Sequence, residues 1–126
     1  MEVGEITKKV VVVEDNLSVK DVAKIMSEKN LGSVVVVDNG NIIGIVTERD
    51  ILKNLDKQSK PISTVMSKNV LTINVTDSIE EAKDIMIKNK KKRLPVLDEG
   101  KLVGIVKITN VLAEISEEIE EPFLFN

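Results

Sequence analysis

Thr47 and Asp50 are the residues whose types and spacing best suit contact with a bound ligand. They end the segment Gly44-Ile45-Val46-Thr47-Glu48-Arg49-Asp50, which leads from an apolar stretch into a predicted helix. Free N–H groups at a helix start favour an anion such as phosphate, and Arg49 adds a positive charge there. A carboxylate one turn further on can accept hydrogen bonds from hydroxyl groups. The same Thr-x-x-Asp spacing is also a capping box, so both residues can equally serve only to begin the helix.

A related segment sixty residues later carries different polar side chains. Its Gly-Ile-Val run is kept, but Lys107 and Asn110 stand at the positions of Thr47 and Asp50. Lysine is a point charge that can meet a phosphate or fill the space with its own stem. Asparagine offers one carbonyl but no charge, and Thr109 can supply a hydroxyl contact. We therefore expect two unequal sites, and whether the second is occupied stays open.

The composition argues against several classes of function. The chain has no His and no Cys, which removes the commonest general base, the commonest metal ligand and the thiolate nucleophile. Asp38 and Asp98 precede glycines and are explained as turn residues, so we expect no enzyme activity. The 18 basic and 21 acidic residues give no basic surface for nucleic acid. Without a long apolar run or a signal-like N-terminus, we expect a cytoplasmic protein that does not enter a membrane.

The two ligand-like segments belong to an internal repeat with a constant offset of sixty residues. Gly40 and Gly44 recur as Gly100 and Gly104, and Ser18 recurs as Ser78. Such a period indicates two copies of one supersecondary unit. Because a unit of this size buries only about 60% of its unfolded surface, we expect the two copies to share a core.

Each copy is predicted to form a β-α-β-β-α unit, which makes the fold class mixed α/β (α+β). Ser18 and Ser78 are expected to begin helices through capping boxes, with Asp21 and Glu81 reaching back. Asn39-Gly40 is a strong hairpin signal, whereas Glu99-Gly100 is weaker. The predicted strands are 10–13, 33–37 and 42–46 in the first copy and 70–73, 94–97 and 102–106 in the second, and the final helices start near Thr47 and Thr109.

The chain resembles a tandem CBS-domain protein, a pair also called a Bateman module. The resemblance rests on the segment from Gly44 to Asp50 and on Arg93-Leu94-Pro95-Val96-Leu97-Asp98, and it covers essentially the whole chain. It implies two repeats packed about a pseudo-twofold axis, residues 1–55 and 62–115, joined by a linker at 56–61. Residues 116–126 are expected to be an acidic C-terminal extension. An acidic helix is expected at residues 114–121, across the start of this extension, and an apolar tail at 122–125.

What the resemblance implies about function is regulation through a bound ligand. Members of the family bind AMP, ADP, ATP or S-adenosylmethionine in clefts between the repeats, commonly form homodimers, and are not themselves catalytic. We therefore expect an adenine-nucleotide sensor that signals to a partner in trans. The acidic C-terminal helix with Phe123 and Phe125 is a candidate partner contact, or it supports only the dimer. The alternative is a structural dimerisation module with empty clefts.

The resemblance also assigns candidate site residues. Asp50 would bind the ribose hydroxyls, with Gly44 allowing the ligand close to the backbone. Arg93 and Lys92 would meet phosphates, whereas the equivalent positions of the first copy, Gly32 and Ser33, are uncharged. The residues expected around one adenine are Ile45, Met66 and Leu71, and around the other Ile105, Ile6 and Val11, although each is also explained by plain core packing.

Overall fold

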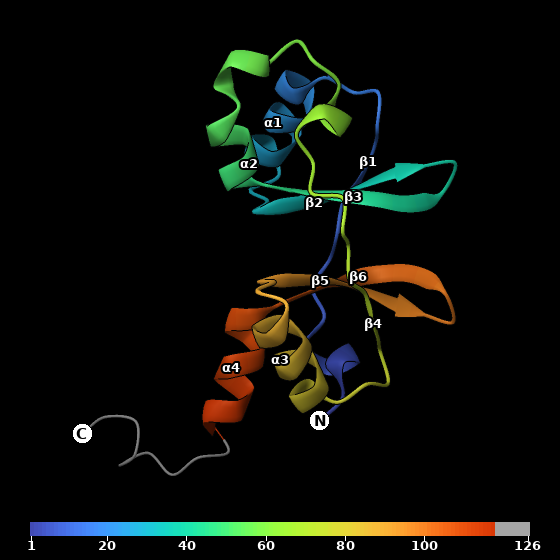
Figure 1. Ribbon diagram of the computed structural model, residues 1–126. Coiled ribbons are helices and arrows are strands. Elements are labelled where there is room, and N and C mark those ends of the chain that lie inside the picture. The colour runs from blue at the N-terminus through green and yellow to red at the C-terminus, as the bar shows by residue number, and fades with distance from the viewer. Residues whose placement is uncertain (118–126) are drawn as a thin grey trace, which may run out of the picture. The chain divides into compact units, whose positions relative to one another are not determined.

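A computed structural model describes residues 1–117 of the chain as two compact mixed α/β units (Figure 1). The continuous unit contains residues 10–70, and of the described residues the discontinuous unit combines 1–9 with 71–117. Each unit has a three-stranded sheet with two helices on one of its faces. The predicted fold class and the duplicated β-α-β-β-α order are confirmed.

The two sheets have the same topology. In each, the first strand pairs in parallel with the middle strand, which pairs antiparallel with the last. The continuous unit contains β1 (Val12–Glu14), α1 (Val19–Glu28), β2 (Ser33–Asp38), β3 (Asn41–Thr47), α2 (Glu48–Lys53) and the 3₁₀ turns Leu55–Lys57 and Ile62–Thr64. The discontinuous unit contains a 3₁₀ turn at Val3–Ile6, β4 (Ile73–Asn74), α3 (Ile79–Lys88), β5 (Arg93–Asp98), β6 (Lys101–Lys107) and α4 (Ile108–Glu117).

The first strand of each sheet starts later than the sequence predicts from the runs at 10–13 and 70–73. Residues 10 and 70 precede the pairing, because the ladder of β1 starts at Val12 opposite Val35 and that of β4 at Ile73 opposite Val96. A β-branched run indicates extended backbone, but only the partner strand decides where hydrogen bonding begins. The α4 helix also starts one residue before the predicted Thr109. The predicted acidic extension is described only to Glu117, and the apolar tail at 122–125 lies outside the described residues.

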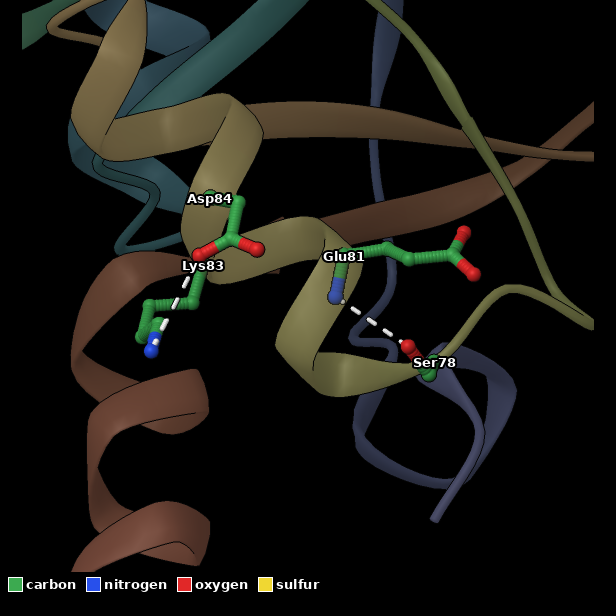
Figure 2. Close-up of polar contacts among 4 residues, drawn as sticks. All are labelled: Ser78, Glu81, Lys83 and Asp84. Atoms are coloured by element: carbon green, nitrogen blue, oxygen red, sulfur yellow. Dashed lines mark hydrogen bonds and ion pairs between the residues drawn. The ribbon is translucent and has the colours of Figure 1, made fainter.

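The serine caps predicted for the first helix of each copy are present, but only in part. The Asp21 N–H donates to Ser18 Oγ at 3.0 Å, and the Glu81 N–H donates to Ser78 Oγ at 3.1 Å (Figure 2). The expected return contact from each acidic side chain is absent from the hydrogen bonds of residues 1–117, so the capping-box prediction was wrong in this half. A serine cap satisfies an orphan donor by itself, and an exposed carboxylate is equally well solvated by water.

Both hairpins have the same turn conformation, although their sequences predict it unequally. Asn39 and Gly40 have φ values of 51° and 78°, and Glu99 and Gly100 have values of 49° and 80°. Two consecutive positive φ values are what a two-residue hairpin turn with the twist of the flanking strands requires. In the second hairpin, glutamate therefore adopts a conformation that favours Asn, because Gly100 and the strand pairing determine the turn.

The segment that precedes the first strand of each sequence repeat packs into the core of the unit that contains the other repeat. Val3 and Ile6 belong to the core that α3, α4 and the β4–β6 sheet enclose. Ile62 is fully buried in the core beneath α1 and the β1–β3 sheet, with Val65 and Met66 packed against it. The segment expected to be a linker, residues 56–61, lies within the continuous unit, where the Val19 N–H donates to the Lys60 carbonyl at 2.9 Å. The two segments that precede the first strands, residues 1–9 and 62–70, are called the leading segments. Each belongs to the compact unit that contains the other sequence repeat.

Candidate functional site at the strand ends

Asp50 is held beside the end of β3 by Thr47. The Thr47 N–H donates to Asp50 Oδ2 at 2.9 Å, and the Thr47 hydroxyl lies 3.1 Å from the same oxygen. The Asp50 N–H donates in return to Thr47 Oγ1 at 3.3 Å, which completes a capping box. Both side chains are half-buried. Among residues 1–117, the contacts of the carboxylate all fall on Oδ2, so Oδ1 remains able to accept from another donor.

The start of α2 offers less to an anion than its sequence suggests. The Glu48 N–H donates to the Gly32 carbonyl at 3.1 Å, and the Asp50 N–H donates to Thr47. Two of the first three amide groups of this six-residue helix therefore already have partners within the protein. The capping role that the sequence allowed is real, and the site's distinctive group is the positioned carboxylate rather than an open helix end. Arg49 is exposed beside it.

Gly44 and Gly104 allow close approach, but by the protein itself. A Cβ atom at Gly44 would collide with the side chain of Met66, and one at Gly104 would collide with Thr7 Cγ2 and lie 2.5 Å from the Lys8 carbonyl oxygen. The edge strands are covered there, since Ile45 exchanges two backbone hydrogen bonds with Ser67 and Ile105 exchanges two with Lys8. The prediction that Gly44 makes room for a ligand was wrong, because the leading segment occupies that space.

The corresponding end of the discontinuous unit is basic. Arg93, the first residue of β5, lies directly opposite Lys107, the last residue of β6. Both side chains are half-buried, and Arg93 Nε is buried with no hydrogen-bond partner among residues 1–117. The one ion pair among residues 1–117 is Lys83 with Asp84, on α3, so neither cation is neutralised within that part of the chain (Figure 2). Like charges facing each other across two strands destabilise a sheet, and an anion would relieve them.

The start of α4 in the discontinuous unit lacks the capping box found at the start of α2. The hydrogen bonds of residues 1–117 include none from the side chains of Lys107 or Asn110, so the capping box is not repeated. Asn110 is half-buried, and Thr109 and Lys92 are exposed. The Lys92 carbonyl accepts from the Ile108 N–H at 2.8 Å, which connects the start of α4 to the start of β5. The two strand ends thus differ in charge, one presenting a carboxylate and the other cations.

A comparison with protein families identifies both repeats. The CBS domain matches residues 3–57 and 62–117. The chain belongs to the CBS domain family. A CBS domain pair from the protein MJ0100, solved in complex with 5′-methylthioadenosine and S-adenosyl-L-methionine, is 28% identical with a TM-score of 0.83 over 94% of this chain and 98% of that one. CBSX2, solved in complex with AMP, is 27% identical with a TM-score of 0.76 over 93% and 97%.

The CBS pair also occurs within longer proteins. A Methanocaldococcus jannaschii protein, MJ1232, is 34% identical over 125 residues, which are 98% of this chain and 42% of that protein. A 17.7 kDa protein of Acidianus ambivalens is 43% identical over 110 residues, which are 83% of this chain and 66% of that protein. Inosine-5′-monophosphate dehydrogenase of M. jannaschii is 31% identical over 109 residues, only 22% of the enzyme. The chain thus spans less than two thirds of these relatives.

The structure distributes the predicted site residues of the CBS pair between its two units. Ile45 is half-buried at the covered edge of β3, next to the segment that carries Met66. Ile6 is 8% exposed as a member of the core of the discontinuous unit, so core packing explains its burial. Ile105 is 3% exposed, at the edge of β6 that Lys8 covers. The continuous unit contains Val11, Ile45, Thr47, Arg49, Asp50 and Met66, and the discontinuous unit contains Ile6, Leu71, Lys92, Arg93, Ile105, Lys107, Thr109 and Asn110.

Sequence reasoning placed Ile6 and Met66 of the leading segments near a ligand, but it missed the contacts of these segments with the edge strands. Thr7 and Lys8 cover β6, and Ser67 covers β3. The sixty-residue repeat contained a usable signal, since Lys8 and Lys68 occupy equivalent positions just before the two predicted first strands, 10–13 and 70–73. In residues 1–117, no helix is both long and apolar enough to cross a bilayer, and no cluster of acidic side chains is arranged to hold a metal ion.

Proposed function

We propose that this CBS pair is a regulatory module that binds adenine nucleotides and passes the binding signal to a partner protein. The observation that carries the proposal is the Asp50 carboxylate, which the capping box holds at the end of β3 with one oxygen unused. Two ribose hydroxyls are suitable donors to such a group. Support comes from related CBS pairs that were solved with AMP and with S-adenosylmethionine and methylthioadenosine.

The second site, in this proposal, recognises the same class of ligand through its phosphates. Arg93 and Lys107 present two cations from paired positions, and Lys92 adds a third beside them. Arginine matches the geometry of phosphate oxygens through its planar fork, and lysine meets them as a point charge. Because Asn110 lacks the charge of Asp50, the second site should bind ribose more weakly. The candidate apolar contacts for the adenine are Ile45, Met66 and Val11 in the continuous unit and Ile105, Ile6 and Leu71 in the discontinuous unit.

Thermal unfolding with millimolar AMP, ADP, ATP or S-adenosylmethionine tests the proposal. A ligand that binds only the folded state at 100 times its dissociation constant adds about 2.7 kcal/mol to the free energy of unfolding. We expect at least one of the four ligands to raise the midpoint clearly, with inosine and free phosphate as controls. If none of the four does, the protein is a structural module with empty clefts.

Lys107→Thr, which introduces the residue of the first repeat, should have opposite effects on stability and on binding. Removing one of two facing cations should stabilise the ligand-free protein by about 0.2–1 kcal/mol. The same change should weaken ATP more than adenosine, because only ATP carries the phosphates. Chemical denaturation and titration calorimetry measure the two effects. Lys101→Thr, at the other end of β6 opposite Asp98, changes the net charge equally and should not show this combination.

The proposed output is regulatory rather than catalytic. The inosine-5′-monophosphate dehydrogenase match covers only a small part of that enzyme, which fits a module that accompanies catalytic domains. A ligand can shift an equilibrium between two conformations only if it binds one of them more tightly. We therefore propose that ligand binding favours one state of the CBS pair, as a homodimer in the cytoplasm, and that a partner protein recognises this state.

A further inference from the structure

The outer face of the α1–α2 helix pair is hollow and apolar. Two adjoining hollows, with volumes of about 320 and 260 Å³, share Ala23, Ser27 and Ile51 in their lining. Leu52 borders the first hollow and is 68% exposed, and Leu55 borders the second and is 56% exposed. An apolar, concave surface with leucines this open to water is typical of a site for protein contact.

The equivalent face of the α3–α4 helix pair carries projecting apolar side chains. By the sixty-residue offset, Ile87 is the equivalent of Ser27, and Leu112 is the equivalent of Leu52. Ile87 is 62% exposed and Leu112 is 44% exposed. Ser27 and Leu52 both line the first hollow, so their equivalents belong to the corresponding face of the discontinuous unit. One face therefore has a groove where the other has large side chains, which suits ridge-into-groove packing of helices.

The rows of charged side chains along these two faces have inverted signs. Positions four residues apart on a helix lie on the same side of it. Along α1 the row is positive, positive, negative, and along α3 it is negative, negative, positive. The α1 row consists of Lys20, Lys24 and Glu28, and the α3 row, at the equivalent positions, of Glu80, Asp84 and Lys88. All six side chains are exposed, and Lys20 and Lys24 line the second hollow, so the α1 row borders the groove.

Within residues 1–117, these six charges are almost unused. The one ion pair joins Lys83 Nζ to Asp84 Oδ1 at 3.8 Å, and the Asp84 side chain is 76% exposed (Figure 2). Exposed pairs of this kind contribute little stability, so the Asp84 carboxylate can still meet a second cation. The other five charges form no ion pair in the described part of the chain. Both rows are therefore free to pair with an external surface of matching charge.

We propose that the α1–α2 face of one copy binds the α3–α4 face of a second copy, with α1 and α3 parallel and in register. Each charge of the α1 row then lies opposite its inverted equivalent on α3, so all three pairs are attractive. Ile87 lies opposite Ser27 and enters the first hollow. The inference rests on the homodimer of the proposed function, for which it names the contacting faces, but not on nucleotide binding.

Other pairings of the same helices are less favourable. Two α1 helices, or two α3 helices, packed in parallel would place like charges opposite each other at all three positions. Antiparallel packing of α1 on α3 would keep one attractive pair of the three, and antiparallel self-pairing would keep two. Self-pairing also sets groove against groove or projecting side chain against projecting side chain. Like charges across an interface suppress a wrong pairing, so charge and shape favour the same arrangement.

A charge exchange between two variants tests the contact. Lys20→Glu with Lys24→Glu reverses the two cations of α1, and Glu80→Lys with Asp84→Lys reverses the two anions of α3. Analytical ultracentrifugation of the full chain without nucleotide should show each variant associating at least about tenfold more weakly than the wild type. An equimolar mixture should regain the wild-type affinity, because each α1 row then meets an opposite α3 row on the other variant. Such rescue requires contact between copies, since neither variant contains both reversals.

One control separates this contact from net charge. Lys9→Glu with Lys68→Glu changes the net charge as much as the α1 variant does, at exposed positions outside the helices, and should associate like the wild type. Chemical denaturation checks that every variant is folded, as substitutions at exposed positions predict. Equal weakening in the control would mean that net charge alone explains the effect, which would overturn the proposal.

Three further results would also overturn it. They are a wild type that stays monomeric at millimolar concentration, a helix variant that associates as tightly as the wild type, and a mixture that regains nothing. A monomeric wild type would assign the groove to a different protein. None of these results bears on nucleotide binding, which the thermal unfolding experiment measures separately.

Discussion

Replacing Asp50 by alanine should lower the affinity of the tighter site for an adenine nucleotide about tenfold or more. A hydrogen bond to a charged group contributes about 1.5–3 kcal/mol, and the carboxylate has an oxygen that the capping box does not use. Titration calorimetry of the wild type and the variant with AMP, ADP, ATP and S-adenosylmethionine measures the change. Unchanged affinity for every ligand that binds the wild type would refute the role of this carboxylate.

Two control variants separate ligand contact from helix capping. Asp50→Asn retains an oxygen that can accept from the Thr47 N–H but removes the charge, so it should weaken binding while preserving most of the stability. Ser18→Ala removes a cap on α1 and should cost about 1 kcal/mol in unfolding free energy with no effect on affinity. A loss of affinity in Ser18→Ala equal to that in Asp50→Ala would mean that helix stability alone explains the effect.

Replacing Ile62 by alanine should destabilise the continuous unit, which contains the first sequence repeat, although Ile62 lies in the second. Ile62 is the first residue of the second CBS match, yet its side chain is fully buried in the core of the continuous unit. Truncation of a buried isoleucine costs about 2–5 kcal/mol, depending on how far the cavity collapses. Native-state hydrogen exchange should therefore show faster opening of β2, where Val34 and Val36 pack in the same core.

The reciprocal substitution provides the comparison for Ile62→Ala. Ile6 lies in the core of the discontinuous unit, so Ile6→Ala should affect β5 more than β2. Ile87→Ala removes the same side chain from a position that is 62% exposed and should have little effect on either unit. If Ile62→Ala instead accelerated exchange in β5 and left β2 unchanged, the assignment of the leading segments to the two cores would be incorrect.

The two strand ends show how duplication can lead to different roles. Equivalent positions hold Thr47 and Asp50 in one unit and Lys107 and Asn110 in the other. The first pair forms a capping box, while the second makes no side-chain hydrogen bond within residues 1–117. Ser33, a buried polar residue opposite Thr47, has Arg93 as its counterpart. The same backbone frame therefore supports one acidic and one basic end.

Much of the candidate site could be predicted because its chemistry is local. The Thr47–Asp50 contact spans three residues, so spacing alone indicates both the helix start and the carboxylate. The pairing of Arg93 with Lys107 could not be read in the same way, because their approach depends on the register of β5 and β6. The role of Gly44 was misjudged for a related reason, since its neighbour Met66 comes from a distant segment.

The sequence by itself determined the duplicated β-α-β-β-α order, the serine caps, the hairpin positions and the residue types at both strand ends. These features follow from periodicity and short-range hydrogen bonding, which act within a few residues. Only the tertiary structure decided that residues 1–9 complete one core and residues 62–70 the other. Those outcomes depend on which apolar surfaces meet after the chain has folded, and burial acts between surfaces regardless of their separation in the sequence.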